Sequence, residues 1–297
     1  MQQRMKTIDA AAMDFVRMLL GPNPSAAYDL MSKTGQAETT REKLDAAAEA
    51  IIRKFEPKNV TLQHTYFIEW KGKSPTLVHC GTVRFGQIVW KSVTTESTPE
   101  QAHVLLSADA RKEKLAFVVW LVPEQNDWKV RNFRLNNVST LAGKDSIQLW
   151  QLARTQQARG HTFNASELYG AALATASRGP NINLGLSESI VNDGAKLIPP
   201  ADIQGQPPYL WRNAETTYKM MGVGLIAIDG KIYVRMVHEV PPWQSDRQVG
   251  AWNKEMLSYF KRHFPECSDA FAGLVAVATE RGSKREYSTV EELTAAK

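Results

Sequence analysis

Residues 115–135 read LAFVVWLVPEQNDWKVRNFRL, and this stretch indicates the fold more clearly than any other. Two strongly apolar runs are separated by Glu-Gln-Asn-Asp, a combination typical of a tight turn. The preceding segment, QAHVLLSAD followed by ARKEK, has the same form, a strand-like run that ends in polar residues. The sequence therefore predicts consecutive antiparallel strands joined by hairpins, the last of them in WKVRNFRLNNV.

Three helices are expected at the start of the chain. Apolar residues recur at helical spacing over residues 8–20, and Gly-Pro-Asn-Pro then ends that helix. Ser25 is expected to cap a second helix. A third is expected to begin at Thr39 or Thr40 and to end before Pro57.

Beyond Pro57 the apolar period changes from that of a helix to that of a strand. VTLQHTYFIEW alternates, which would place one set of side chains on a single face: Val60, Leu62, His64, Tyr66, Ile68 and Trp70. The next run, residues 76–94, is too long for one flat strand, and Gly81 and Gly86 are expected to mark bulges or bends. Residues 1–142 are therefore predicted to form helices followed by a curved antiparallel sheet.

This order of elements, closed by the hairpin LAFVVWLVPEQNDWKVRNFRL, resembles the cystatin-like cone fold of the nuclear-transport-factor-two-like superfamily. The resemblance covers the first half of the chain and rests on no catalytic signature. It implies a sheet that curves around a pocket closed by helices. Some members of that superfamily are isomerases or dehydratases with an Asp, His or Tyr in the pocket, and many others only bind ligands or partners. Pairing of the sheets into a homodimer is common among them.

Residues 143–198 are expected to form a helical connector. Asp145 or Ser146 can cap its first helix, and Asn164, with Glu167 three positions on, can cap the second in a capping box. Residues 146–180 resemble a single tetratricopeptide-type helical hairpin. A solenoid needs further copies, so one hairpin docked on its neighbours is the better interpretation.

Residues 199–297 are predicted to form a small α+β domain of β-β-α-β order with a proline-rich lead-in. LIPPADIQGQPPYLWRN is expected to be a linker or extended arm. A hairpin is expected around Asp229-Gly230, followed by a helix in SDRQVGAWNKEMLSYFKRHF. FAGLVAVATERG is expected to be a buried strand, and REYSTVEEL a polar strand or a terminal helix.

Composition excludes several broad classes. Of 297 residues, 43% are hydrophobic and 23% are charged, as in a globular protein, and no apolar run is long enough to span a membrane. The net charge of +5 comes from scattered Lys and Arg, so no nucleic-acid partner is expected. Two cysteines imply no disulfide framework. The charged N-terminal segment is not a signal peptide, which favours the cytoplasm; the alternative is an exported bacterial protein whose signal has been removed.

The candidate pocket lies in the first half of the chain. If the face of residues 60–70 is concave, its polar side chains would point into the cone, where a general acid or base would work. Other residues could join from neighbouring strands, while Asp109 and Asp127 are expected in turns. The candidate ligand-binding residues are His64, Tyr66, Trp70, Arg84, His103 and Trp120.

A secondary candidate is His238 with Trp243, at the end of a strand that Pro241 and Pro242 must terminate. His238 and Glu239 are adjacent on the strand and therefore face apart, so a stiff strand end covered by Trp243 is favoured over a pocket rim. A metal site formed by His238, Asp246, His263 and Cys267 is not favoured, since no paired motif is present.

Nucleophilic catalysis is not indicated. Cys80 and His79 are adjacent in a strand-like run and would face apart, and no G-x-S-x-G motif occurs. The favoured hypothesis is a non-enzymatic protein that binds a small molecule or a protein partner, without a metal or cofactor. The alternative is a cone-type lyase or isomerase that acts by acid-base chemistry without a metal.

Overall fold

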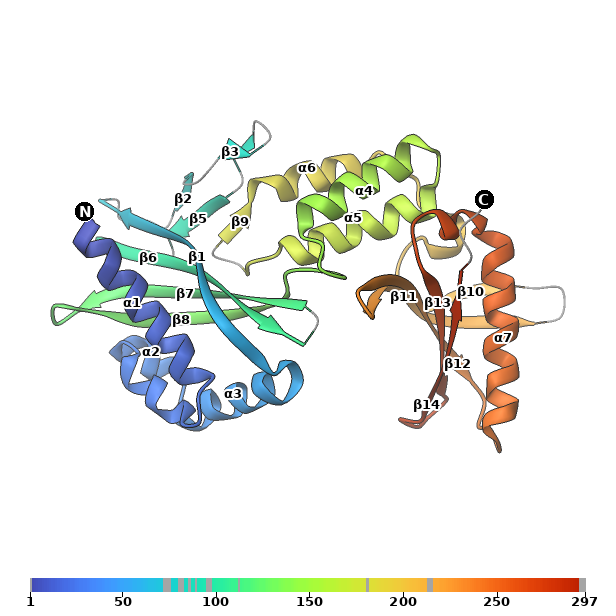
Figure 1. Ribbon diagram of the computed structural model, residues 1–297, viewed down its shortest axis with the longest axis horizontal. Coiled ribbons are helices and arrows are strands. Elements are labelled where there is room, and N and C mark those ends of the chain that lie inside the picture. The colour runs from blue at the N-terminus through green and yellow to red at the C-terminus, as the bar shows by residue number, and fades with distance from the viewer. Residues whose placement is uncertain are drawn as a thin grey trace. The chain divides into compact units, whose positions relative to one another are not determined.

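The computed structural model describes residues 2–71, 76–79, 83–84, 87–88, 90–94, 98–111, 113–179, 182–212 and 216–293. It confirms the predicted α+β class, with sheets that are mainly antiparallel (Figure 1). The chain divides into two compact units. The first contains residues 1–140 and 174–189, and the second contains residues 141–173 and 190–297.

The first unit begins with the expected helical segment: α1 (Gln2–Leu19), the 3-10 helix η1 (Pro24–Leu30), α2 (Lys33–Glu38) and α3 (Arg41–Phe55). The Thr40 side chain accepts a hydrogen bond from the Lys43 backbone and so caps α3, as predicted. The prediction for Ser25 is wrong. The second segment is a 3-10 helix without a side-chain cap, and the Ser25 hydroxyl donates instead to Asp45 of α3 at 2.6 Å.

The central sheet of the first unit has the strand order β1-β6-β7-β8. All neighbouring strands in it are antiparallel: β1 (Pro57–Glu69), β6 (Glu100–Ala110), β7 (Glu113–Glu124) and β8 (Asp127–Val138). The hairpin predicted over residues 115–135 is thereby confirmed, with Gln125 and Asn126 at positive φ in its turn. Helix α1 packs across the four strands (Figure 1).

One face of this sheet and the helices share an apolar core. Alternate residues of β6 and β7, such as Val104, Leu106, Phe117 and Val119, pack there with Phe15 of α1. The remaining residues of these strands therefore lie on the face opposite this core. That second face carries the polar side chains discussed below.

Bulges in β1 change which side chains share a face. The register shifts between Lys58 and Thr61 and again between Leu62 and His64. As a result Val60 packs on the helix side together with Phe67, whereas Tyr66 packs on the opposite side. The expectation that Val60, His64 and Tyr66 share one face through uninterrupted alternation is therefore wrong.

A smaller sheet of order β2-β5-β9 completes the first unit. Its strands, with the separate pair β3-β4, are β2 (Thr76–His79), β3 (Val83–Arg84), β4 (Gln87–Ile88), β5 (Trp90–Thr94) and β9 (Ile182–Leu184). The run 76–94 is divided into several strands, as its length predicted; Cys80, Gly81 and Gly86 lie outside the described residues. The expectation that residues 143–198 form a helical connector fails at β9, which pairs antiparallel with β5.

Three helices follow the central sheet: α4 (Ser146–Ala158), α5 (Thr162–Ala176) and α6 (Gly185–Gly194). Asp145 caps α4, and Gln148 completes a capping box. The predicted cap at Asn164 is wrong, because α5 already begins at Thr162. The Asn164 amide instead donates to Gln156 at 3.0 Å and to the carbonyl oxygen of Glu266 at 2.6 Å.

The second unit contains a five-stranded sheet of order β10-β11-β12-β13-β14. Its elements are β10 (Tyr209–Arg212), β11 (Thr217–Ile228), β12 (Lys231–Val240), α7 (Asp246–His263), β13 (Gly273–Glu280) and β14 (Glu286–Glu292), with short 3-10 helices η2 (Ala201–Ile203) and η3 (Pro265–Asp269). The Asp229-Gly230 hairpin, the helix and the buried strand are confirmed. Strands β12 and β13 are parallel and are connected through α7.

The proline-rich lead-in ends inside this sheet. Residues Tyr209–Arg212 form the edge strand β10, and Trp211 is fully buried against Tyr259, Phe260 and Phe264. Its indole nitrogen donates to the Asp202 carbonyl oxygen. The end of this segment is therefore a structural part of the sheet.

Candidate functional site

Three of the six candidate pocket residues form one transverse row on the central sheet. Tyr66 of β1 lies directly opposite His103 of β6, and His103 lies directly opposite Trp120 of β7. Directly opposed side chains on antiparallel strands are close enough to interact. The sequence predicted that these residues could meet, and the strand register brings them together.

The rings of this row are in contact. The His103 and Trp120 rings stack, with centroids 5.7 Å apart and an interplanar angle of 11°. Next to them on β1, His64 and Tyr66 meet edge to face, with centroids 4.4 Å apart. We call the set Tyr66, His103 and Trp120, with Gln101 and His64 beside it, the polar row.

Arg131 anchors one end of the polar row. It is the extra residue of a β-bulge, because Trp120 pairs with Asn132 while Leu121 pairs with Val130. Its guanidinium lies 5.4 Å from the centre of the Trp120 ring. The same group donates two hydrogen bonds, of 2.7 and 2.6 Å, to the Glu38 carboxylate of α2. The Arg131 side chain lowers the pKa of Glu38 through these bonds.

Most of the polar row is buried, and it is rich in hydrogen-bonding atoms without partners among the described residues. Gln101 and His103 are both fully buried. Both side-chain polar atoms of Gln101, both ring nitrogens of His103 and the indole nitrogen of Trp120 have no hydrogen-bond partner among the described residues. Such groups are rare in protein interiors, and each costs about 1–3 kcal/mol when it stays unpaired.

Burial keeps both histidines of the polar row neutral near pH 7. It lowers the pKa of His103 to about 4, and it also lowers the pKa of His64. A neutral imidazole carries one donor and one acceptor nitrogen. The row therefore offers donors and acceptors without a net charge of its own.

Ile182 of β9 covers part of this face. It packs with Tyr66, Leu105 and Val118, so a residue that is distant in the sequence covers the Tyr66 end of the polar row. The sequence did not predict this contact. The three residues of β9, Ile-Asn-Leu, are too few to indicate a strand or its pairing with β5.

The other two primary candidates are not in the row. Trp70 lies just beyond the end of β1, where its backbone nitrogen donates to the Pro99 carbonyl oxygen at 2.8 Å. Arg84 belongs to the short strand β3, and its side chain lies outside the described residues.

The secondary candidate His238 belongs to the interior of the second unit. Its Nε2 atom lies 2.7 Å from the Oδ1 atom of Asn253, and the Asn253 amide nitrogen donates to the backbone oxygens of Ala276 and Tyr287. The Oδ1 atom is therefore the acceptor and His238 donates. Burial lowers the pKa of His238, although the bond to Asn253 opposes the shift.

Trp243 forms a separate contact cluster. It packs against Val240, Val249 and Ala278, with the Arg285 guanidinium 4.4 Å from its ring centre. Glu239 faces away from His238, as the alternation of the strand predicted, and it binds Lys219 and Arg281. Hydrogen bonds from Arg281 and, to a smaller extent, from Lys219 lower the pKa of Glu239.

In the described part of the chain, no group of three or more His, Cys, Asp or Glu side chains is placed to hold an ion. Helix α7 ends at His263, and the His263 Nδ1 atom is 3.0 Å from the Tyr259 carbonyl oxygen. Cys267 is buried, and burial strongly raises the pKa of its thiol.

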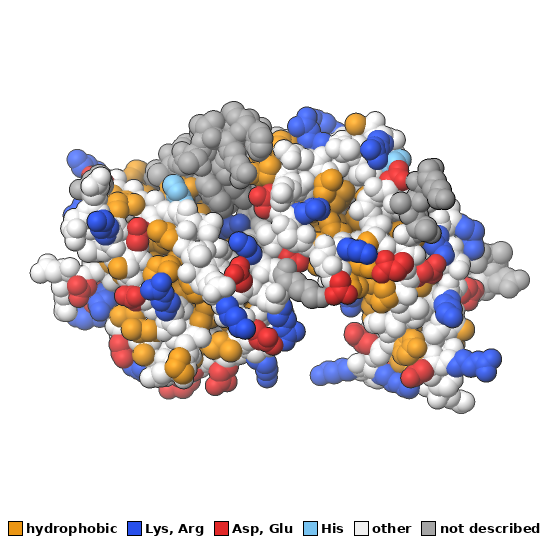
Figure 2. Space-filling model, viewed as in Figure 1, with side chains coloured by type: hydrophobic (Ala, Val, Ile, Leu, Met, Phe, Trp, Pro, Cys, Tyr) orange, Lys and Arg blue, Asp and Glu red, His pale blue; other side chains and the backbone are white. Residues whose placement is uncertain are grey.

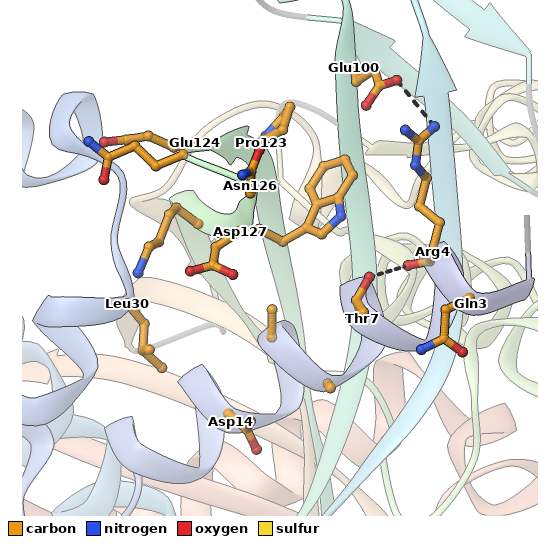
Figure 3. A pocket seen from close by; sticks show the side chains of 15 residues that line it. Gln3, Arg4, Thr7, Asp14, Leu30, Glu100, Pro123, Glu124, Asn126 and Asp127 are labelled. Atoms are coloured by element: carbon orange, nitrogen blue, oxygen red, sulfur yellow. Dashed lines mark hydrogen bonds and ion pairs between the residues drawn. The ribbon is translucent and has the colours of Figure 1, made fainter.

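A surface groove that sequence reasoning missed lies on the first unit (Figure 3). Its volume is about 850 Å³, and it runs between α1 and the turn that joins β7 to β8. The apolar part of its lining comprises Ala10, Ala11, Leu30, Pro123 and Trp128. Its charged lining comprises Arg4, Asp14, Glu100, Glu124, Asp127 and Lys129.

On the face shown in Figure 2, Lys and Arg side chains are interspersed with Asp and Glu and do not gather into a patch of one charge. Within the described ranges, none of the helices is both long and apolar enough to cross a membrane. No known family model matches the chain, and no curated protein is similar enough to be matched with it.

Proposed function

We propose that the first unit is a non-enzymatic binding module for a small, uncharged polar molecule held by the polar row. The observation that carries this proposal is the set of buried donors and acceptors on Gln101, His103 and Trp120 that have no partner among the described residues. A ligand that supplies those partners would recover the free energy that unpaired groups cost.

The chemistry of the row indicates the class of ligand. Gln101 and neutral His103 each present a donor and an acceptor, and Trp120 adds a donor beside a stacked ring. A planar molecule with amide-like or hydroxyl groups would match these atoms. A charged ligand would be disfavoured, because burying its charge would require an opposite charge nearby. The guanidinium of Arg131 and the carboxylate of Glu38 already pair with each other.

The resemblance to the cystatin-like cone agrees with a binding role and suggests where a pocket would lie. In this chain the helix side of the central sheet is filled by apolar side chains. The proposed site is therefore on the opposite face, beside Ile182.

The test compares the wild-type protein with Gln101→Leu and His103→Leu. Both substitutions replace a polar side chain with an apolar one of similar size. The protein is incubated with a cell extract, repurified and denatured, and released small molecules are identified by mass spectrometry. A compound released by the wild type and by the control Gln151→Leu, an exposed site on α4, but not by the two variants would support the proposal.

Two results would overturn it. Variants that are more stable than the wild type, with no compound released from any protein, would make the row a purely structural element. An activity screen in which the wild type turns over a substrate, and His64→Ala loses about a hundredfold in rate or more, would favour the alternative lyase or isomerase.

A further inference from the structure

The groove of Figure 3 has an excess of carboxylates that are not neutralised by neighbours. Arg4 closes one end through ion pairs with Glu100 at 3.2 Å and with Glu69 at 3.7 Å. Glu124 accepts a hydrogen bond from the Lys33 backbone at 3.0 Å. The side chains of the remaining acidic residues, Asp14 and Asp127, have no ion pair or hydrogen bond among the described residues and are exposed.

These two carboxylates come from opposite walls. Asp14 belongs to α1, and Asp127 begins β8 directly after the hairpin turn (Figure 3). Gln125 and Asn126 of that turn have positive φ, so a tight turn fixes the position of Asp127. Both walls therefore carry negative charge, although the Asp14 carboxylate points away from Asp127 in Figure 3 and the two groups do not converge on one point.

The floor of the groove suits the stem of a long side chain. Ala10, Ala11 and Leu30 offer an apolar surface, and Trp128, which is only partly buried, adds an aromatic ring. Trp128 is supported by Phe67, whose ring meets it at 85° with centroids 6.0 Å apart. Aliphatic stems pack on apolar surface, and cationic head groups are attracted to tryptophan rings.

We propose that this groove binds an extended segment of a partner protein through an arginine or lysine side chain. The stem lies along Ala10 and Ala11, the cationic head lies beside Trp128 and the Asp127 carboxylate, and Asp14 adds to the negative charge of the α1 wall. Lys129 also lines the groove, so that four acidic and two basic side chains surround it and the balance remains negative. An anionic partner such as a nucleic acid is disfavoured by the same charges.

The proposal is tested by fluorescence anisotropy with two labelled peptides. One alternates leucine and arginine, and the other replaces each arginine with citrulline, which keeps the shape and removes the charge. The arginine peptide is expected to bind at least about tenfold more tightly, and its affinity should fall as salt is raised, because the interacting charges are exposed to solvent.

Matched variants locate the binding. Asp14→Asn and Asp127→Asn should each weaken binding of the arginine peptide by about threefold or more, whereas Glu49→Gln, at an exposed site on α3, should not. Trp128→Leu should weaken it as well, with circular dichroism used to check that this variant folds. Equal binding of the two peptides, no binding of either, or unchanged affinity in both Asp variants would overturn the proposal.

Discussion

The Nε2 atom of His238 lies 2.7 Å from the Oδ1 atom of Asn253, and this hydrogen bond joins β12 to α7 inside the second unit. Asn253 is fully buried. Its amide nitrogen lies within hydrogen-bonding distance of the carbonyl oxygens of Ala276 and Tyr287 and of the Thr289 hydroxyl. One side chain therefore links the helix to three strands of the sheet.

Replacement of Asn253 by Ala is expected to lower the free energy of unfolding by about 2–4 kcal/mol, because it leaves several buried groups without partners. Urea denaturation followed by circular dichroism measures the change. Asn192→Ala, at an exposed position of α6, serves as the control and should change the stability little. An Asn253→Ala variant as stable as that control would show that the network contributes nothing.

Gly273 and Gly170 should respond in opposite ways to replacement by Ala. A Cβ atom on Gly273 would lie 2.4 Å from the Tyr233 ring and 2.6 Å from the Glu291 carbonyl oxygen, whereas one on Gly170 would meet nothing within 4 Å. We expect Gly273→Ala to cost about 2 kcal/mol or more through overpacking, and Gly170→Ala to stabilise α5 by about 0.5–1 kcal/mol. The melting temperatures of the two variants decide the comparison.

Arg131 is expected to need its guanidinium and not merely a positive charge. Lysine in its place would lose the two-bond geometry with Glu38 and the contact with Trp120, at a cost of about 1–3 kcal/mol in unfolding free energy. The control pair, Arg111 and Glu56, is exposed on both sides, so Arg111→Lys should cost about 0.5 kcal/mol or less. Equal effects of the two substitutions in urea denaturation would contradict this prediction.

Stability should fall as the solution is acidified, and His103 should account for part of the loss. In the unfolded chain a histidine takes up a proton near pH 6.5, but in the folded protein burial lowers the pKa of His103 to about 4. Between these two values the unfolded state binds more protons, so the free energy of unfolding decreases as pH falls through that window.

The contribution of one such histidine is about 1.4 kcal/mol per pH unit within the window. Denaturation series between about pH 7 and about pH 5 should therefore show a shallower pH dependence for His103→Leu than for the wild type. Gln101→Leu, which removes a neighbour that does not titrate, should retain the wild-type slope. Parallel slopes for the wild type and His103→Leu would refute the assignment.

Local chemistry made much of the fold predictable. Both residues of the Asp229-Gly230 turn have positive φ, and so do Gln125 and Asn126 in the turn after β7. Residue types that tolerate such turns therefore allowed both hairpins to be predicted from the local sequence. The end of α7 before Pro265 follows from the same kind of local rule. Such features depend on a few neighbours in the chain.

The errors concern features set by distant contacts. β9 is too short to show a period, and its partner β5 is about ninety residues away. The bulges of β1 reverse the face of Val60 relative to Tyr66, and Asn164 fits a capping pattern although its amide binds Glu266. The polar row could be predicted in part, since Tyr66, His103 and Trp120 are side chains with polar atoms on expected strands. The groove was not, since its walls come from separate elements.

The first unit is built from two separate segments of the chain, so it cannot be completed during synthesis until the second segment has been translated. Residues 1–140 leave the ribosome before residues 174–189, which supply β9 and Ile182. At usual elongation rates this interval lasts roughly 2–10 seconds. Throughout it the nascent central sheet has no Ile182 over Tyr66, Leu105 and Val118. We therefore expect the emerging chain to be a substrate for chaperones that recognise exposed apolar surface, until the last residues of the unit have been translated.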